Sequence, residues 1–99
     1  MDMTYELLNK NNIKMSVGIY PWPAQIIFDT RNSKIVSLIE NFCINKCEFF
    51  FNNFPEFFDE INTSNKEYII FKYYIEGDVH FNSLGNEKLF INFKNKFKY

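Results

Sequence analysis

The sequence contains very little glycine, proline, cysteine and histidine. Its 99 residues include three Gly, three Pro, two Cys and one His. So few Gly and Pro residues argue against a loop-rich scaffold. No run of about 18 apolar residues occurs, so we expect no transmembrane helix. Residues 1–6 contain no basic region followed by an apolar one, so we expect no signal peptide, and the compartment stays unassigned.

An excess of charge of one sign is also missing. The chain has 11 basic and 12 acidic residues and a formal net charge of −1. Proteins that bind the phosphate backbone of nucleic acids carry a basic patch, so we expect no nucleic-acid partner. Hydrophobic residues, by contrast, make up 46% of the chain, and 13 Phe and 6 Tyr are among them. This composition predicts a folded protein, and the length predicts a single domain over residues 1–99.

Two short apolar segments are typical of buried strands. Residues 13–20 are almost continuously apolar from Met15 onward, and residues 47–51 have the same character. Strands of a parallel sheet are covered on both faces, and they therefore lack the alternation of polar and apolar residues seen in half-exposed strands. Gly18, inside the first segment, indicates that another part of the protein packs closely against it.

Helical patterns surround these strands. Residues 4–11, residues 33–44 and the segment that begins at Ser83 are predicted helices, and Ser33 (or Asn32) and Ser83 are their expected caps. The buried face of the last helix is expected to comprise Leu89, Phe90, Phe93 and Phe97.

Three connecting segments are less regular. Residues 24–28 are predicted as an apolar connector and residues 54–59 as a loop that enters a helical turn. Residues 65–74 permit a strand or a buried helix, although their β-branched and aromatic content favours a strand. The order of elements predicts a β-α-β unit with flanking helices, and therefore an α/β fold with a short parallel sheet and a right-handed crossover.

Cys43 and Cys47 are four residues apart. Together with one histidine they are too few for a structural zinc site, which has four ligands, and we expect no metal and no cofactor. Two interpretations remain open. The cysteines are either a pair of small buried thiols or a disulfide, and the latter requires the preceding helix to end between them.

Trp22 lies between two prolines directly after the first predicted strand. In open parallel sheets, ligands bind beyond the carboxyl ends of the strands. Trp22 is therefore a candidate substrate-binding residue, whose flat face suits a sugar ring or an acyl group. The alternative is that the indole covers one end of the core.

His80, the only histidine, follows Asp78 with one residue between them. A carboxylate that orients an imidazole forms two thirds of a nucleophilic triad, because the acid selects the tautomer and stabilises the imidazolium. Asp78 and His80 are therefore candidate catalytic residues. The alternative is a surface or capping histidine without a catalytic role.

Several of these segments together resemble the C-terminal half of an SGNH hydrolase, also called the GDSL family. The resemblance spans roughly residues 5–95 and is carried by residues 16–25, 42–43, 54–55, 77–82 and 84–86. Its most specific parts are the Tyr-Pro-Trp-Pro sequence at residues 20–23 and the Gly-Asp-Val-His-Phe-Asn sequence at residues 77–82.

The resemblance implies a fold and an activity. Members of this family are three-layer α/β/α, flavodoxin-like proteins that hydrolyse or transfer ester-linked acyl groups, so this chain is expected to form part of such a domain. His80 then corresponds to the general base and Asp78 to its orienting acid. The commoner motif has two residues between Asp and His, whereas only Val79 separates them here.

The family's nucleophile block has no counterpart in this chain. No Gly-Asp-Ser motif and no Gly-x-Asn-Asp motif occur, so the nucleophilic serine and the oxyanion donors are missing. The five serines fall in a strand, at expected caps, on a helix or in a polar loop, and none lies on a strand-to-helix elbow. These are Ser16, Ser33, Ser37, Ser64 and Ser83.

The sequence therefore predicts the C-terminal fragment of an ester hydrolase or O-acyltransferase that is inactive alone. Its expected partner is a complementing N-terminal half or a second copy of the chain, and its expected substrate is a small acyl ester or an O-acylated saccharide. One alternative is a non-catalytic remnant or interaction module that pairs with another chain. Another is an unrelated small α/β protein whose aromatic residues form the core. An unpaired edge on the strand at residues 13–20 predicts association in either of the first two cases.

Overall fold

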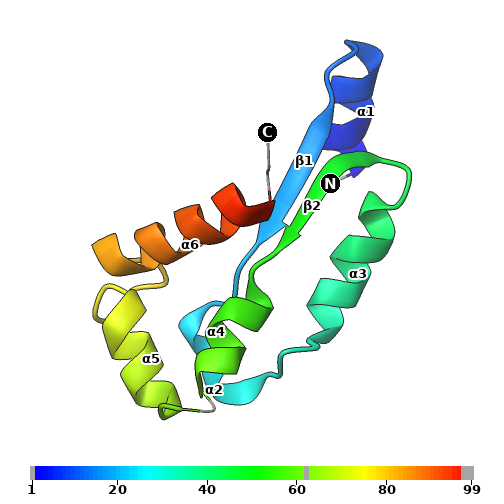
Figure 1. The fold of residues 1–99 in the computed structure, drawn as a ribbon. Helices are drawn as coiled ribbons and strands as arrows, with labels where there is room; N and C mark the ends of the chain where they lie inside the picture. The colour runs from blue at the N-terminus through cyan, green and yellow to red at the C-terminus, as the bar shows by residue number, and fades with distance from the viewer. Residues whose placement is uncertain (1, 62, 97–99) are drawn as a thin grey trace.

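The computed structural model describes residues 2–61 and 63–96, which form an α/β fold (Figure 1). Its elements are α1 (Asp2–Lys10), β1 (Met15–Ile19), α2 (Pro23–Phe28), α3 (Lys34–Cys43), β2 (Cys47–Asn52), α4 (Phe54–Ile61), α5 (Lys66–Tyr73) and α6 (Ser83–Lys96). The predicted β-α-β order is confirmed. None of the helices in these two ranges is both long enough and apolar enough to cross a membrane.

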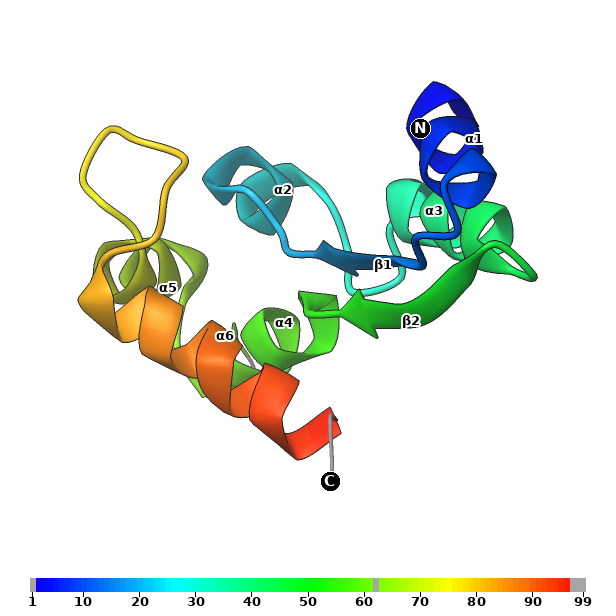
Figure 2. The same ribbon diagram turned by 90° about the horizontal axis from the view of Figure 1, so that it is seen from above.

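The two strands form a parallel sheet. Val17 pairs with Phe50 and Ile19 with Asn52, and an irregularity interrupts the register between Met15 and Val17. Seen from above, α3 lies on one side of the strands and α6 on the other, near their carboxyl ends (Figure 2). Within the described residues each strand has one neighbour, so each has one unpaired edge.

The prediction that both faces of the first strand are buried is wrong. Met15 is buried and Val17 and Ile19 are half-buried, but Ser16 and Gly18, which point to the opposite face, are exposed. The close packing expected at Gly18 is also not made, because a Cβ atom there would meet only the Cβ of Phe51, at 3.8 Å. The face of β1 on the α6 side is therefore open.

Three segments are more helical than the sequence suggested. The expected connector at residues 24–28 belongs to α2, which has Pro23 in its first turn, where the missing N–H is not needed. The Gln25 side chain accepts a hydrogen bond from the Trp22 N–H at 2.9 Å and stabilises this start. The turn expected after residue 54 extends into the whole of α4.

The ambiguous segment at residues 65–74 is the helix α5. Asn65 caps it by accepting a hydrogen bond from the Tyr68 N–H at 2.7 Å. Ile69 and Tyr73, four residues apart, are its buried residues and lie on one helical face. Tertiary packing of this face therefore overrides the strand preference of the β-branched and aromatic residues.

The helix caps are partly as predicted. Ser33 caps α3, as expected, and accepts a hydrogen bond from the Ile35 N–H. Ser83, however, is the first residue of α6, and the cap is the side chain of Asn82, which accepts from the Gly85 N–H at 2.9 Å. The expected buried face of α6 is confirmed only at Leu89, which packs against the core, and is wrong at Phe90 and Phe93, which are 62% and 44% exposed. Phe97 lies outside the described residues.

The main core lies among the helices. Its buried residues are Ile26, Phe57, Ile69, Tyr73, Tyr74 and Phe81. The rings of Phe57 and Phe81 stack with centroids 5.3 Å apart and planes 8° from parallel. The core therefore joins α2, α4 and α5 to the segment before α6.

Cys43 and Cys47 form a disulfide, so the alternative of two free thiols is wrong. The helix α3 ends at Cys43 and β2 begins at Cys47, as the disulfide interpretation requires. Asn45, between them, has a φ of 66°, in the left-handed region that Asn tolerates better than most residues. The bond closes the short turn that leads from the helix into the strand.

Candidate functional site

Asp78 and His80 form a hydrogen-bonded pair in the loop between α5 and α6. The distance between Asp78 Oδ1 and His80 Nδ1 is 2.8 Å. The same carboxylate oxygen accepts a hydrogen bond from the Val79 N–H at 2.7 Å. Because a carboxylate only accepts, the pair places the imidazole proton on Nδ1 and leaves the lone pair on Nε2.

The pair is open to solvent. The side chain of His80 is 72% exposed and that of Asp78 is 44% exposed. The hydrogen bond from His80 lowers the pKa of Asp78, and the backbone N–H of Val79 lowers it further. The carboxylate is therefore ionised at neutral pH and is able to stabilise an imidazolium on His80.

Backbone hydrogen bonds hold the two ends of this loop together. The Ile75 N–H donates to the His80 carbonyl at 3.0 Å, and Tyr74 and Phe81 form an antiparallel bridge. Gly77, at the tip, has a φ of 72°, which glycine adopts without strain. The local sequence thus forms a tight loop that presents His80 at its surface.

Asn82 and Gly85 attach this loop to the end of α5. The Asn82 side chain donates to the Lys72 carbonyl at 2.9 Å while it caps α6. Gly85 lies so close to α5 that a Cβ atom there would be 2.2 Å from the Tyr73 carbonyl oxygen. The sequence interpretation gave neither residue a positioning role, although an Asn directly before a helical pattern is a capping signal.

The loop after β1 lies against the His80 loop. The ring centroids of Tyr20 and Phe81 are 4.7 Å apart, and the Tyr74 hydroxyl donates a hydrogen bond to the Pro21 carbonyl. Burial raises the pKa of Tyr74, so the hydroxyl keeps its proton and remains a donor. The segment after the carboxyl end of β1 and the Asp-His loop therefore share one region of the molecule.

The structure does not place Trp22 in a cavity with His80. The indole is 53% exposed and lines a cavity of about 320 Å³ on the α3 side of the sheet, together with Ile35 and Ile39. The other half of the indole surface is covered, so a role in covering one end of the core stays a prediction. A role for Trp22 in substrate binding also stays a prediction.

No nucleophile accompanies His80 in the part of the chain that the structure describes. No serine hydroxyl is hydrogen-bonded to the His80 ring there, and both cysteines are in the disulfide. Ser33, for example, donates to Asp29 at 2.5 Å and caps α3. No group of three or more His, Cys, Asp or Glu residues in these ranges could hold a metal ion.

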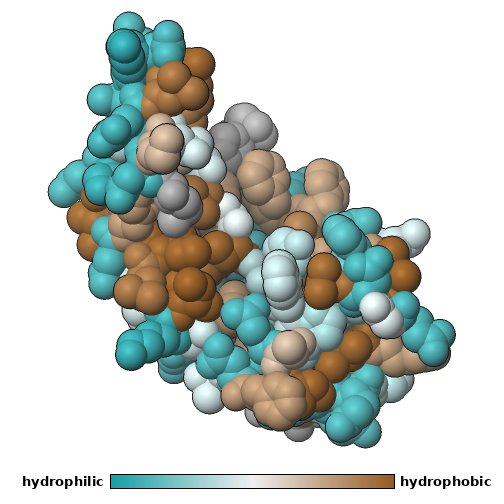
Figure 3. Space-filling model, turned by 180° about the vertical axis from the view of Figure 1, so that it is seen from behind, coloured by the Kyte–Doolittle hydropathy of each residue, from teal (hydrophilic) through white to brown (hydrophobic). Residues whose placement is uncertain are grey.

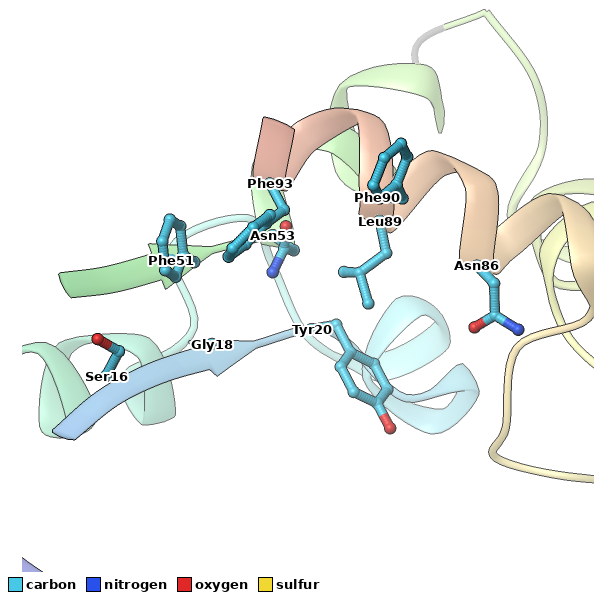
Figure 4. Close-up of a pocket in the computed structure, with 9 residues that line it drawn as sticks. All are labelled: Ser16, Gly18, Tyr20, Phe51, Asn53, Asn86, Leu89, Phe90 and Phe93. Carbon is cyan, nitrogen blue, oxygen red and sulfur yellow. The ribbon is translucent and has the colours of Figure 1, made fainter. Parts of the chain in front are cut away.

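A groove of about 490 Å³ runs between β1 and α6 (Figure 4). It is lined by Ser16, Gly18, Tyr20, Phe51, Asn53, Asn86, Leu89, Phe90 and Phe93. Tyr20 and Asn86 lie at one end, next to the loop that enters α6, and Phe51 and Phe93 lie toward the other end. The sequence interpretation missed this groove, apart from the expectation that another group packs against Gly18.

A polar cluster around Glu60 was also missed. Its carboxylate accepts hydrogen bonds from Tyr73 at 2.7 and 2.9 Å, from Lys88 at 3.3 Å and from Lys72 at 3.4 Å. Burial alone would raise the pKa of Glu60, but the Tyr73 hydrogen bond and the two ammonium groups outweigh it and lower the pKa. The partners are 12 to 28 residues away from Glu60 in the sequence, so no short sequence motif predicts the cluster. Its charges are compensated, which favours a structural role in joining α4, α5 and α6.

Comparison with known proteins identifies no relative. No protein-family model matches the chain, and no curated protein or solved structure matches it at a significant level.

Proposed function

We propose that this chain is the C-terminal part of an SGNH-type ester hydrolase or O-acyltransferase, and that it contributes His80 as the general base and Asp78 as its orienting acid. The observation that carries the proposal is the Asp78–His80 hydrogen bond, which occupies Nδ1 and directs the basic Nε2 to solvent. Asp78 and His80 would be two of the three members of a nucleophilic triad, and a serine on another segment would complete it.

In this mechanism the proton moves through the imidazole. His80 Nε2 takes the proton from the incoming serine hydroxyl as the oxygen attacks the ester carbonyl, and Asp78 stabilises the resulting imidazolium. His80 then gives the proton to the departing alcohol. The serine and the oxyanion donors come from a complementing segment, so the chain alone does not carry out this reaction. The chemistry requires no cofactor.

The open sheet supports the need for a complementing segment. A parallel sheet of two strands is small, and stable sheets usually have three or more. Here the outer edge of β1 is unpaired, and Ser16 and Gly18 are exposed on one of its faces. A complementing segment that adds strands at this edge would extend the structure toward the three-layer flavodoxin-like arrangement.

An O-acylated saccharide is the substrate class that we propose. The half-exposed indole of Trp22 offers an apolar face on which a sugar ring can stack. Trp22 follows the carboxyl end of β1, where ligands of parallel sheets commonly bind.

The test is hydrolysis of p-nitrophenyl acetate by the chain alone and by the chain co-expressed with the polypeptide encoded directly upstream. We expect activity only in the combination, a complete loss with His80→Ala and a loss of about 10³–10⁴-fold with Asp78→Asn. Val79→Ala, in the same loop, is the matched control and should retain activity. Turnover that is unchanged by His80→Ala, or no turnover from folded protein in either form, would contradict the proposal.

A non-catalytic interaction module is the second candidate. It is favoured by the exposed apolar side chains of α1 and α3, of which Leu7 and Leu38 are 64% and 59% exposed. Seen from behind, brown hydrophobic surface extends over the region of α3 (Figure 3). Surfaces of this kind commonly mark protein–protein contacts. A module of this type would form a defined complex whether or not His80 is present, and the His80→Ala variant separates the two candidates.

A further inference from the structure

We propose that the Cys43–Cys47 disulfide is a redox switch that controls whether α1 stays folded against the rest of the molecule. When the bond is formed, the turn between α3 and β2 holds α1 in place, and reduction of the bond releases α1. The switch lies outside the Asp78–His80 pair and does not depend on the proposed catalytic function.

The helix α1 is attached to the molecule by few contacts. None of its residues is buried, and only Tyr5 and Leu8 are half-buried. It has nine residues. Isolated helices shorter than about 12–15 residues are marginal in water, because the cost of the first turn is spread over few hydrogen bonds. The helical state of α1 therefore depends on its contacts with other elements.

The turn that the disulfide closes provides several of these contacts, and α1 lies near this turn in both ribbon views (Figures 1 and 2). The ammonium nitrogen of Lys46 is 5.8 Å from the centre of the Tyr5 ring and 4.6 Å from the centre of the Phe42 ring. It is also 3.6 Å from a carboxylate oxygen of Asp2. The rings of Tyr5 and Phe42 meet edge to face with centroids 6.4 Å apart. Each contact is weak at an exposed position, so α1 stays docked only while the turn holds all of them together.

The disulfide fixes the geometry of this turn. The buried residues of α3 are Val36, in its first turn, and Cys43, its last residue. Cys43 is therefore the buried side chain that holds the end of α3 against β2, through its bond to Cys47. The Lys46 N–H donates to the Cys43 carbonyl at 3.0 Å. When the bond is broken, the end of α3 loosens, and both Phe42 and Lys46 move away from α1 with it.

Thiol–disulfide exchange with a dithiol reductant operates the switch. A thiolate of the reductant attacks the sulfur of Cys47, which is half-buried, whereas Cys43 is only 6% exposed. The S–S bond breaks, and Cys43 leaves as a thiolate. The second thiolate of the reductant then attacks its own sulfur in the mixed disulfide and releases Cys47. The reductant ends as a disulfide, and the two cysteines gain two electrons and two protons in total.

The direct test is amide hydrogen exchange in mixtures of reduced and oxidised dithiothreitol, followed by ¹H–¹⁵N NMR. The amides of residues 6–10 bond within α1, and reduction should make them exchange faster by about tenfold or more. This change should have the same midpoint as the appearance of free thiols, counted by alkylation with iodoacetamide. The amides of α5 should keep their protection. Equal protection of α1 in the two redox states, or equal acceleration in α1 and α5, would overturn the proposal.

A variant at Lys46 tests the connection between the disulfide and α1. Lys46→Gln keeps the disulfide but removes the charge that faces Tyr5 and Asp2, so α1 should exchange faster in the oxidised protein, and reduction should then add little. Lys14→Gln is the matched control, because Lys14 forms an ion pair of the same length, 3.6 Å, with Glu48 on β2, and it should leave α1 protected. A protected α1 in oxidised Lys46→Gln would overturn the proposal.

Replacement of both cysteines by serine should reproduce the reduced state without a reductant. The amides of α1 should then exchange as fast as in the reduced parent and should no longer respond to dithiothreitol. An α1 that stays protected in this variant, or that still responds to dithiothreitol, would show that the disulfide does not control it and would overturn the proposal.

Discussion

Two parts of this molecule are packed very differently. We call α2, α4, α5 and α6 the helical end, and α1, β1, α3 and β2 the sheet end. At the helical end, Ile26, Phe57 and Ile69 are completely buried. Within β1, β2 and α3, the buried apolar side chains are Met15, Val36, Cys43 and Phe51, and each retains 6–9% exposure. Phe54, which is 1% exposed, lies where β2 leads into α4. The disulfide also lies at the sheet end.

This difference indicates which part of the chain folds through its own contacts. The helical end buries apolar side chains from four separate segments, and burial of apolar area is the dominant favourable term in folding. The sheet end exposes one face of β1 and an edge of each strand. The Asp78–His80 loop is attached to the well-packed end, through the Asn82 side chain and the Tyr74–Phe81 bridge.

The largest effect should come from the helical core. Phe57→Ala removes a completely buried ring that contacts Tyr73, Tyr74 and Phe81, and should lower the free energy of unfolding by about 3–5 kcal/mol. Phe49→Ala is the matched control at the sheet end, where the ring is 42% exposed, and should cost about 1 kcal/mol or less. Chemical denaturation measures both, and equal losses would contradict the contrast between the two ends.

Alanine substitutions at two glycines should show the same contrast, with the larger loss of stability at the helical end. Gly85→Ala places a Cβ atom 2.2 Å from the Tyr73 carbonyl oxygen and 2.9 Å from the Phe81 Cβ, so α6 must shift. Overpacking of this kind should cost about 1–3 kcal/mol and should disturb the His80 loop. Gly18→Ala meets only an ordinary contact and should change stability by less than about 0.5 kcal/mol. Thermal melts of the two variants test this, and a neutral Gly85→Ala would show that α5 and α6 are not locked together.

The disulfide should matter mainly at the sheet end. Replacement of Cys43 and Cys47 by serine removes a constraint on a short loop and should cost about 2 kcal/mol. Hydrogen exchange should show faster opening of β1 and β2, while the amides of α5 keep their protection. Uniform acceleration across the chain would mean that the two ends unfold as one unit and would contradict the comparison.

The smallest effect should be the contribution of Glu60 to the pH dependence of the free energy of unfolding. The folded-state pKa of Glu60 is lowered, so its carboxylate contributes stability above its ordinary pKa, and this contribution is lost as the pH falls through the lower folded value. Glu60→Gln should therefore be less stable than the parent by about 1 kcal/mol at neutral pH. The difference between the two proteins should begin to shrink as the pH falls below the ordinary Glu pKa of about 4.3, and it should vanish below the lower folded-state pKa, as urea denaturation at several pH values would show. A constant difference down to pH 2 would exclude this role.

Local sequence signals accounted for several elements and for the central pair of the site. The apolar segments at residues 13–20 and 47–51 predicted the two strands, and Ser33 was predicted as a helix cap. The spacing of Asp78 and His80 also proved close enough for the hydrogen bond. Each of these features depends on residues that are close together in the sequence, so it can be predicted without the tertiary structure.

Features that join distant segments were not predictable in this way. The helical state of α5 depends on the burial of Ile69 and Tyr73 against the helical core, which overrides a strand-like composition. The exposure of Phe90 on α6 depends on where that helix meets the sheet. In both cases the packing of the segment against distant parts of the chain outweighs the structure that its own sequence favours.

By itself, then, the sequence determined the β-α-β order, the strands, the main caps and the pairing of Asp78 with His80, because each follows from local sterics and short-range hydrogen bonds. Only the tertiary structure decided that the helical end holds the core, that Glu60 gathers Tyr73, Lys72 and Lys88, and that a groove stays open above Gly18. These arrangements depend on segments far apart in the chain that meet where the most apolar surface can be buried.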